Sequence, residues 1–109
     1  MNWVVKYLPE VIKDIKELNG SVRTQIVKGI QKVSQNPLPQ SRGGFGKPLG
    51  NKEGNNLTGL YKIKFRGIGI RAVYALEEKA GIMTLIIVSL RDDSMVYKDA
   101  SKRRKKYEL

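Results

Sequence analysis

The sequence predicts an α+β fold with an N-terminal strand, a two-helix hairpin, a three-stranded antiparallel meander that completes one sheet, and a short C-terminal helix. Two observations support this prediction. Apolar residues recur at helical spacing in two segments of the first half, and three β-prone segments separated by turn signals follow from residue 60 onward. The 109 residues, 40% of them hydrophobic, suit one domain spanning residues 1–109 with a modest core.

The first half begins with Trp3, Val5 and Tyr7 at alternate positions, which predicts a short strand. Two amphipathic stripes follow, ended by the helix-stopping pairs Asn19-Gly20 and Asn36-Pro37. The first stripe consists of Val11, Ile12, Ile15 and Leu18, and the second of Val22, Ile26, Ile30 and Val33. We interpret both stripes as faces turned towards the core.

Two segments carry no such periodicity. Residues 37–59 are rich in glycine and proline, which predicts a mobile connecting loop. Residues 102–109 form a basic tail, in which five consecutive cations run from Lys102 to Lys106. Such a run is typical of a solvated or disordered segment, and the functional alternative is docking on the phosphates of ribosomal RNA.

The segment YKIKFRGIGIRAVY, residues 61–74, predicts a β-hairpin with Gly67 and Ile68 in the turn. This register places Tyr61, Ile63 and Phe65 opposite Tyr74, Ala72 and Ile70 on one apolar face. It also sets Lys64 opposite Arg71 on the other face, with Lys62 next along the strand. Like charges directly opposed repel each other, so a bound anion between them would relieve the repulsion. The alternative is an ordinary solvated face.

A third strand in the run GIMTLIIVSL would bring the following residues back to the same edge of the sheet. Arg91 then arrives beside Arg71, and Tyr97 follows near the start of a helix that Asp92, Asp93 or Ser94 caps. Four cations and a phenol from separate segments thus converge on a candidate anion site.

The composition limits which partners and which catalytic groups the chain can have. The formal net charge is +11, which favours a polyanionic partner such as nucleic acid, an acidic protein or anionic lipid. The chain has no histidine and no cysteine, so a catalyst here must work without imidazole or thiolate. We expect no membrane span, no signal peptide and a cytoplasmic location.

The segments GLYKIKFRGIGIRAVYAL and IIVSLRDDSMVYKDASKR resemble the RelE toxins of the ParE/RelE superfamily, through Tyr-Lys-x-Lys, Gly-x-Arg-x-x-Tyr and Arg-x-x-Ser-x-x-Tyr in that order. The resemblance covers residues 60–104 and implies a ribosome-dependent messenger-RNA endonuclease of a toxin–antitoxin module, with no cofactor or metal. Its catalytic set falls on Lys62, Lys64, Arg71, Arg91 and Tyr97. The chain departs from the family in a longer loop (residues 40–58) and in its basic end.

Residues of this kind support cleavage of RNA by its own 2′-hydroxyl. Arg71 and Arg91 would stabilise the charge that develops on the phosphate, and Lys64 or Tyr97 would act as the base. Tyr97 could also stack on a nucleobase. Further RNA or ribosome contacts are expected from Arg42, Lys47, Arg66, Lys102, Arg103, Arg104, Lys105 and Lys106.

The resemblance also implies partners: messenger RNA in the ribosomal A site, ribosomal RNA, and an acidic antitoxin that forms a hetero-oligomer with the chain. The antitoxin would place carboxylates against the lysines, or displace a C-terminal helix whose apolar stripe is thin. Two alternative functions remain open at this point. They are a ParE-like inhibitor of DNA gyrase, which needs no catalytic set, and a non-catalytic RNA- or ribosome-binding module.

Overall fold

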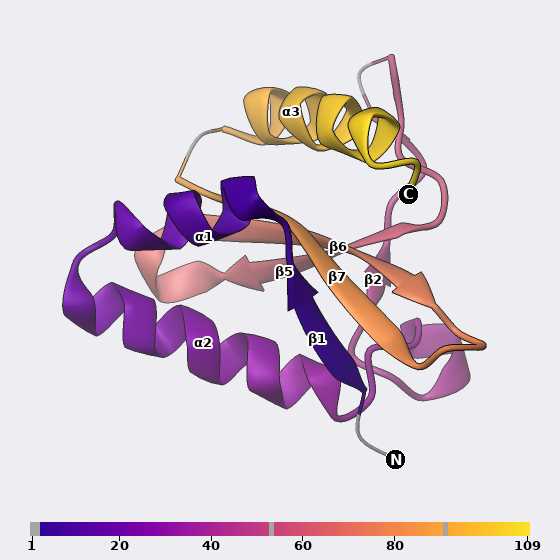
Figure 1. Cartoon of the computed structure of the whole chain (residues 1–109), viewed down its shortest axis with the longest axis horizontal. Helices are drawn as coiled ribbons and strands as arrows, with labels where there is room; N and C mark the ends of the chain where they lie inside the picture. Colours follow the sequence, from indigo (N-terminus) through magenta and orange to yellow (C-terminus); the bar gives the residue numbers. More distant parts are fainter. Residues whose placement is uncertain (1–2, 53, 91) are drawn as a thin grey trace.

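A computed structural model of the chain describes residues 3–52, 54–90 and 92–109, and it confirms the predicted α+β fold (Figure 1). The helices are α1 (Pro9–Lys16), α2 (Gly20–Ser34) and α3 (Asp93–Lys106). The strands are β1 (Val4–Tyr7), β2 (Lys47–Pro48), β3 (Asn51–Lys52), β4 (Asn55–Asn56), β5 (Leu60–Phe65), β6 (Ile70–Glu77) and β7 (Ile82–Ser89). Two 3-10 turns lie at Gln40–Arg42 and Arg66–Ile68.

The main sheet has the strand order β1-β7-β6-β5-β2. The meander β5-β6-β7 is antiparallel as predicted, and β1 joins it parallel to β7. β5 runs in the same direction as β1, and β7 follows it after two antiparallel steps, so β7 also runs parallel to β1. The short pair β3-β4 forms a separate hairpin within the long loop.

The register of the β5-β6 hairpin is the one predicted. Tyr61 pairs with Tyr74, Ile63 with Ala72, and Phe65 with Ile70. The turn is longer than the predicted two residues, since both strands stop short of it and a 3-10 turn fills the gap. Gly69 closes the turn at φ +66°, a left-handed conformation that glycine adopts without strain.

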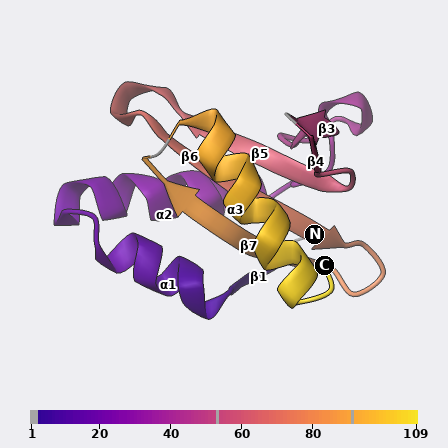
Figure 2. The ribbon, with the colours of Figure 1, turned by 90° about the horizontal axis from the view of Figure 1, so that it is seen from above.

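The two faces of the sheet carry different helices. α2 packs on the face of Tyr61, Ile63 and Phe65, and a Cβ atom at Gly29 would collide with the Phe65 ring, so this glycine permits the close approach. α3 covers the other face, lying across the sheet in the view from above (Figure 2). The fully buried side chains include Val11 of α1, Ile26 and Ile30 of α2, and Leu85 and Ile86 of β7.

The loop after α2 is more organised than the sequence predicts. Its first part is closed by backbone hydrogen bonds from Phe45 N–H to the Asn36 carbonyl and from Gly46 N–H to the Leu38 carbonyl, both 2.9 Å. The hydroxyl of Tyr74, which is fully buried, donates to the Pro37 carbonyl at 2.8 Å and ties the loop to the sheet. Burial raises the pKa of Tyr74, so this hydroxyl stays protonated and keeps donating.

The basic run at the C-terminus is likewise not a separate tail, because α3 continues through Lys106. Asp92 caps this helix by accepting from the Met95 N–H at 3.0 Å, as predicted for one of three candidate caps. Arg103, Arg104 and Lys106 of this run have partners within the chain.

α3 is bound to the part of β7 that extends beyond the end of its neighbour β1. Pairing with β1 stops at Leu85, and Ile86 forms a bulge in the register with β6. The exposed backbone groups of this edge are satisfied by side chains: Arg103 donates to the Ile86 carbonyl at 2.9 Å, and Asp14 accepts from the Val88 N–H at 3.2 Å. Arg103 and Asp14 also pair with each other at 2.7 Å, so α1, β7 and α3 meet in one polar cluster.

A second contact joins the end of α3 to α1. The Tyr107 hydroxyl donates to the Glu10 carboxylate at 2.7 Å, and Lys106 pairs with the same carboxylate at 3.1 Å. The hydrogen bond from Tyr107, with a smaller contribution from Lys106, lowers the pKa of Glu10 to about 2.

Of the helices in the described ranges, none is long and apolar enough to cross a lipid bilayer.

Candidate active site

Three predicted site residues lie together on the sheet face that α3 partly covers. Lys64 of β5 stands directly opposite Arg71 of β6, as the register predicts, and Lys62 lies two residues along the same strand, opposite Val73. Lys64 is exposed, whereas Lys62 and Arg71 are half-buried. The arrangement places two cations side by side on a rigid hairpin rather than on a loop.

The charge between Lys64 and Arg71 is balanced from within the chain. Asp93, in the first turn of α3, forms an ion pair with the Arg71 guanidinium. From the sequence, Asp93 is only a possible helix cap, and no local pattern links it to Arg71, which lies in another element. The pair is partly open to solvent, with 29% of the Arg71 side chain and 44% of the Asp93 side chain exposed. A phosphate entering the site would therefore compete with this carboxylate for Arg71.

A hollow of about 280 Å³ opens beside this pair at the end of the hairpin, and Lys64, Arg66 and Arg71 line it. Arg66 is exposed and belongs to the predicted RNA contacts. Three cations around one concave surface favour a phosphate group, which guanidinium and ammonium donors bind through charge-assisted hydrogen bonds.

Tyr97 is buried, with 5% of its surface exposed, and it packs into the core from α3. In this arrangement its ring is not available to stack on a nucleobase. Arg91 lies outside the described residues, so its predicted place in the site stays a prediction. The preceding strand runs as expected, because Ser89 pairs with Arg71.

The predicted RNA contacts divide into two groups. Lys102 and Lys105 are exposed on α3. Others have partners within the chain: Arg42 pairs with Glu78 at 2.6 Å, Arg104 donates to the Thr58 carbonyl at 2.8 Å, and Arg103 and Lys106 hold α1. The two arginines of α3 are therefore not simply solvated, and their predicted contact with RNA stays a prediction.

Lys47 gains a position that the sequence did not indicate. It lies in β2, directly opposite Lys62 of β5, and so adds a cation at the edge of the sheet. A strand of two residues is too short to show an alternation of apolar and polar residues. Pro48 also argues against a strand, because proline cannot donate a backbone hydrogen bond.

Comparisons with known proteins point to one family. The chain is 31% identical over 104 residues to a RelE-like toxin protein of Escherichia coli, covering 94% of this chain and 98% of the relative. It is 29% identical over 106 residues to the mRNA interferase toxin RelE of Escherichia coli, with the same coverage. No family model matches the chain.

Solved structures agree with the sequence comparison. A double mutant of the Escherichia coli toxin RelE in the free state matches with a TM-score of 0.74 and 26% identity, over 94% of this chain and 98% of that one. The same kind of mutant in complex with an antitoxin RelB peptide matches with a TM-score of 0.68 and 25% identity, over 92% and 95% of the two chains.

Proposed function

The chain belongs to the RelE-like toxins, and from that membership we propose how it acts as an mRNA interferase, the endoribonuclease of a toxin–antitoxin pair. Messenger RNA in the ribosomal A site is the substrate, and cleavage uses the 2′-hydroxyl of the RNA itself as the nucleophile. The pairing of Lys64 with Arg71 beside a cationic hollow is the observation that supports this proposal.

The reaction proceeds in one displacement. A base takes the proton from the 2′-hydroxyl, and the oxygen attacks the adjacent phosphorus. The bond to the 5′-oxygen breaks as an acid protonates that leaving oxygen. The products are a 2′,3′-cyclic phosphate and a 5′-hydroxyl. Arg71, joined by Arg91, stabilises the negative charge that builds up on the phosphate oxygens, and this kind of contribution is worth roughly 10²–10³ in rate for each donor.

Lys64 and Tyr97 are the two proposed bases. Lys64 is exposed at the hollow, whereas Tyr97 is 5% exposed and would have to move with α3 to reach the substrate. Geometry therefore favours Lys64 for proton removal when α3 keeps this position.

The function is tested by mapping RNA 5′ ends in cells after brief induction of the chain. New 5′-hydroxyl ends within translated frames are expected, and the ends should disappear in Arg71→Ala and Arg91→Ala variants that remain folded by circular dichroism. Signs of DNA damage with intact messages would instead identify a gyrase inhibitor. Slowed translation with intact messages would identify a non-catalytic ribosome-binding protein.

The proposed partner is an antitoxin that folds over this domain, and its two routes of inhibition make opposite predictions. If antitoxin carboxylates bind the site, Lys62→Ala/Lys64→Ala weakens antitoxin affinity in a salt-dependent way. If the antitoxin displaces α3, those changes have little effect, and Arg103→Ala strengthens binding because the helix is already loosened. Calorimetric titration with the protein encoded next to this gene, at two salt concentrations, separates the routes.

A further inference from the structure

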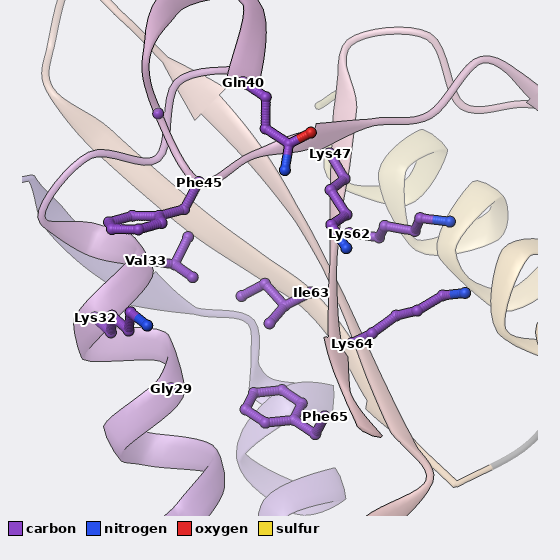
Figure 3. Close-up of a pocket in the computed structure, with 11 residues that line it drawn as sticks. Gly29, Lys32, Val33, Gln40, Phe45, Lys47, Lys62, Ile63, Lys64 and Phe65 are labelled. Atoms are coloured by element: carbon purple, nitrogen blue, oxygen red, sulfur yellow. The ribbon is translucent and has the colours of Figure 1, made fainter. Parts of the chain in front are cut away.

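A groove lies between α2 and β5 (Figure 3), and it shares Lys64 and Phe65 with the hollow beside Arg71. In the described part of the chain, β2 pairs only with Tyr61 and Lys62, which leaves residues 63–65 of β5 at an open edge. The groove encloses about 370 Å³. Pockets for small organic groups begin at roughly 300 Å³, so the space suffices for one nucleobase.

The groove combines an apolar floor with a cationic rim. Figure 3 shows Val33, Ile63 and Phe65 pointing into the space from α2 and β5. The lysines among the described lining residues are Lys32, Lys47, Lys62 and Lys64, and none of those lining residues is acidic. An occupant should therefore present a flat or apolar group together with negative charge.

Phe45 supplies an exposed aromatic surface at the mouth of the groove. Phe45 is 44% exposed, and the Lys32 ammonium lies 5.6 Å from the centroid of its ring. A cation over an aromatic ring is stabilised by the ring's electrons, and the same ring can stack on a nucleobase while the cation contacts its phosphate.

The loop holds this ring in place. The backbone of Phe45 donates to the Asn36 carbonyl at 2.9 Å, and the glycines on either side, Gly44 and Gly46, have no room for a Cβ atom against the carbonyls of the loop. The ring is thus carried by a hydrogen-bonded backbone rather than by a flexible segment. A pre-ordered aromatic surface loses less conformational entropy when it binds a ligand.

From these observations we infer that the groove is a base-binding subsite for single-stranded RNA, in which one unpaired nucleobase stacks on Phe45 and the lysines contact the flanking phosphates. This inference rests on the proposed function. Lys62 and Lys64 connect the groove with the proposed active site. They line the groove at β5, and their side chains extend towards α3 (Figure 3). An RNA strand cleaved beside Arg71 would cross the open edge of β5 and place a neighbouring base in the groove.

The test measures binding separately from cleavage. The probe is a fluorescein-labelled 2′-O-methyl oligouridine of about eight nucleotides, within the site sizes usual for single-strand binders, and it lacks the nucleophile needed for cleavage. Fluorescence anisotropy should show that Phe45→Ala weakens binding by roughly 5- to 100-fold, the range for losing one base–aromatic stack, and that Phe45→Trp restores it. Ile12→Ala is the matched control, because Ile12 is similarly exposed, at 47%, but lies on α1 away from the groove.

A second probe isolates the base from the phosphates. An abasic oligonucleotide of the same length should bind wild type and Phe45→Ala equally, since it has nothing to stack. Equal binding of the oligouridine to wild type and folded Phe45→Ala would overturn the inference. Loss of antitoxin affinity in Phe45→Ala with unchanged oligouridine affinity would also overturn it, and would assign the groove to a protein.

The outcome for the groove is distinguishable from that for the proposed function. If the wild-type chain cleaves no message but binds the oligouridine in a Phe45-dependent way, the subsite stands and the nuclease proposal fails. If the chain cleaves messages and Phe45→Ala affects neither cleavage nor oligouridine binding, the nuclease proposal stands and the subsite inference fails.

Discussion

Replacing Arg103 with alanine should destabilise the fold far more than replacing Arg42, although both arginines pair with a carboxylate at similar distance. The Arg103–Asp14 pair is 2.7 Å long with 19% and 18% of the side chains exposed, whereas the Arg42–Glu78 pair is 2.6 Å long with 54% and 52% exposed. Both are arginine–carboxylate pairs, and they differ in burial and in the additional hydrogen bond from Arg103 to the Ile86 carbonyl.

The expected loss of folding free energy in Arg103→Ala follows from the groups that lose a partner. Asp14 keeps the Val88 N–H but loses its charged partner in a mostly buried place, and the Ile86 carbonyl loses its donor. Breaking a fully buried pair costs about 3–5 kcal/mol, and the remaining exposure reduces this to about 2–3 kcal/mol. An exposed pair such as that of Arg42 contributes roughly 0–1 kcal/mol.

Urea unfolding followed by circular dichroism measures both free energies of unfolding. For a domain of this size, Arg103→Ala should also lower Tm by roughly 10 °C or more. A double-mutant cycle with Asp14→Ala then gives the coupling energy of the pair itself. The reasoning is refuted if Arg103→Ala and Arg42→Ala have equal effects, because burial would then not decide the strength of these pairs.

Three further outcomes are expected. The pKa of Glu10 is lowered from 4.5 to about 2 in the folded protein, so its carboxylate contributes stability above pH 4.5 that is lost as the pH falls towards 2. Glu10→Gln should therefore lose less stability than wild type when urea unfolding at about pH 6 is compared with unfolding at about pH 3. Tyr97→Phe should slow single-turnover cleavage of ribosome-bound message by roughly 10²–10⁴ if the hydroxyl transfers a proton, and an unchanged rate would assign the base to the lysine opposite Arg71. Asp93→Asn should raise the affinity for the 2′-O-methyl oligonucleotide by up to about fivefold, because an exposed ion pair that competes with phosphate is removed; a weaker affinity would contradict competition at Arg71.

Much of the fold and part of the site could be predicted from local pattern. Alternation in the hairpin determined its register, because a slip of one residue would turn Ile63 and Phe65 to the wrong face of the sheet. The same alternation set Lys64 opposite Arg71. The two helices and the third strand followed from periodicity and from stop signals such as Asn19-Gly20. Each of these features depends on neighbours in the chain or on a hairpin partner a few residues away.

The tertiary structure alone decided which charges from distant parts of the chain meet. Asp93 reaches Arg71 from another element, and the strand formed by Lys47 and Pro48 is too short to show a period. Likewise, the groove beside Phe45 is lined by lysines that come from three separate segments.

The C-terminal cations show the physical reason most clearly. As a sequence they form one uniform run, but in a helix each successive side chain points about 100° away from the last. Arg103 therefore turns to Asp14 of α1, Arg104 to the loop carbonyl of Thr58, and Lys105 to solvent. Asp14 and Arg103 are 89 positions apart in the chain. A single sequence carries no signal of such a pair, because only the packing of α3 against the edge of β7 brings the two side chains within reach.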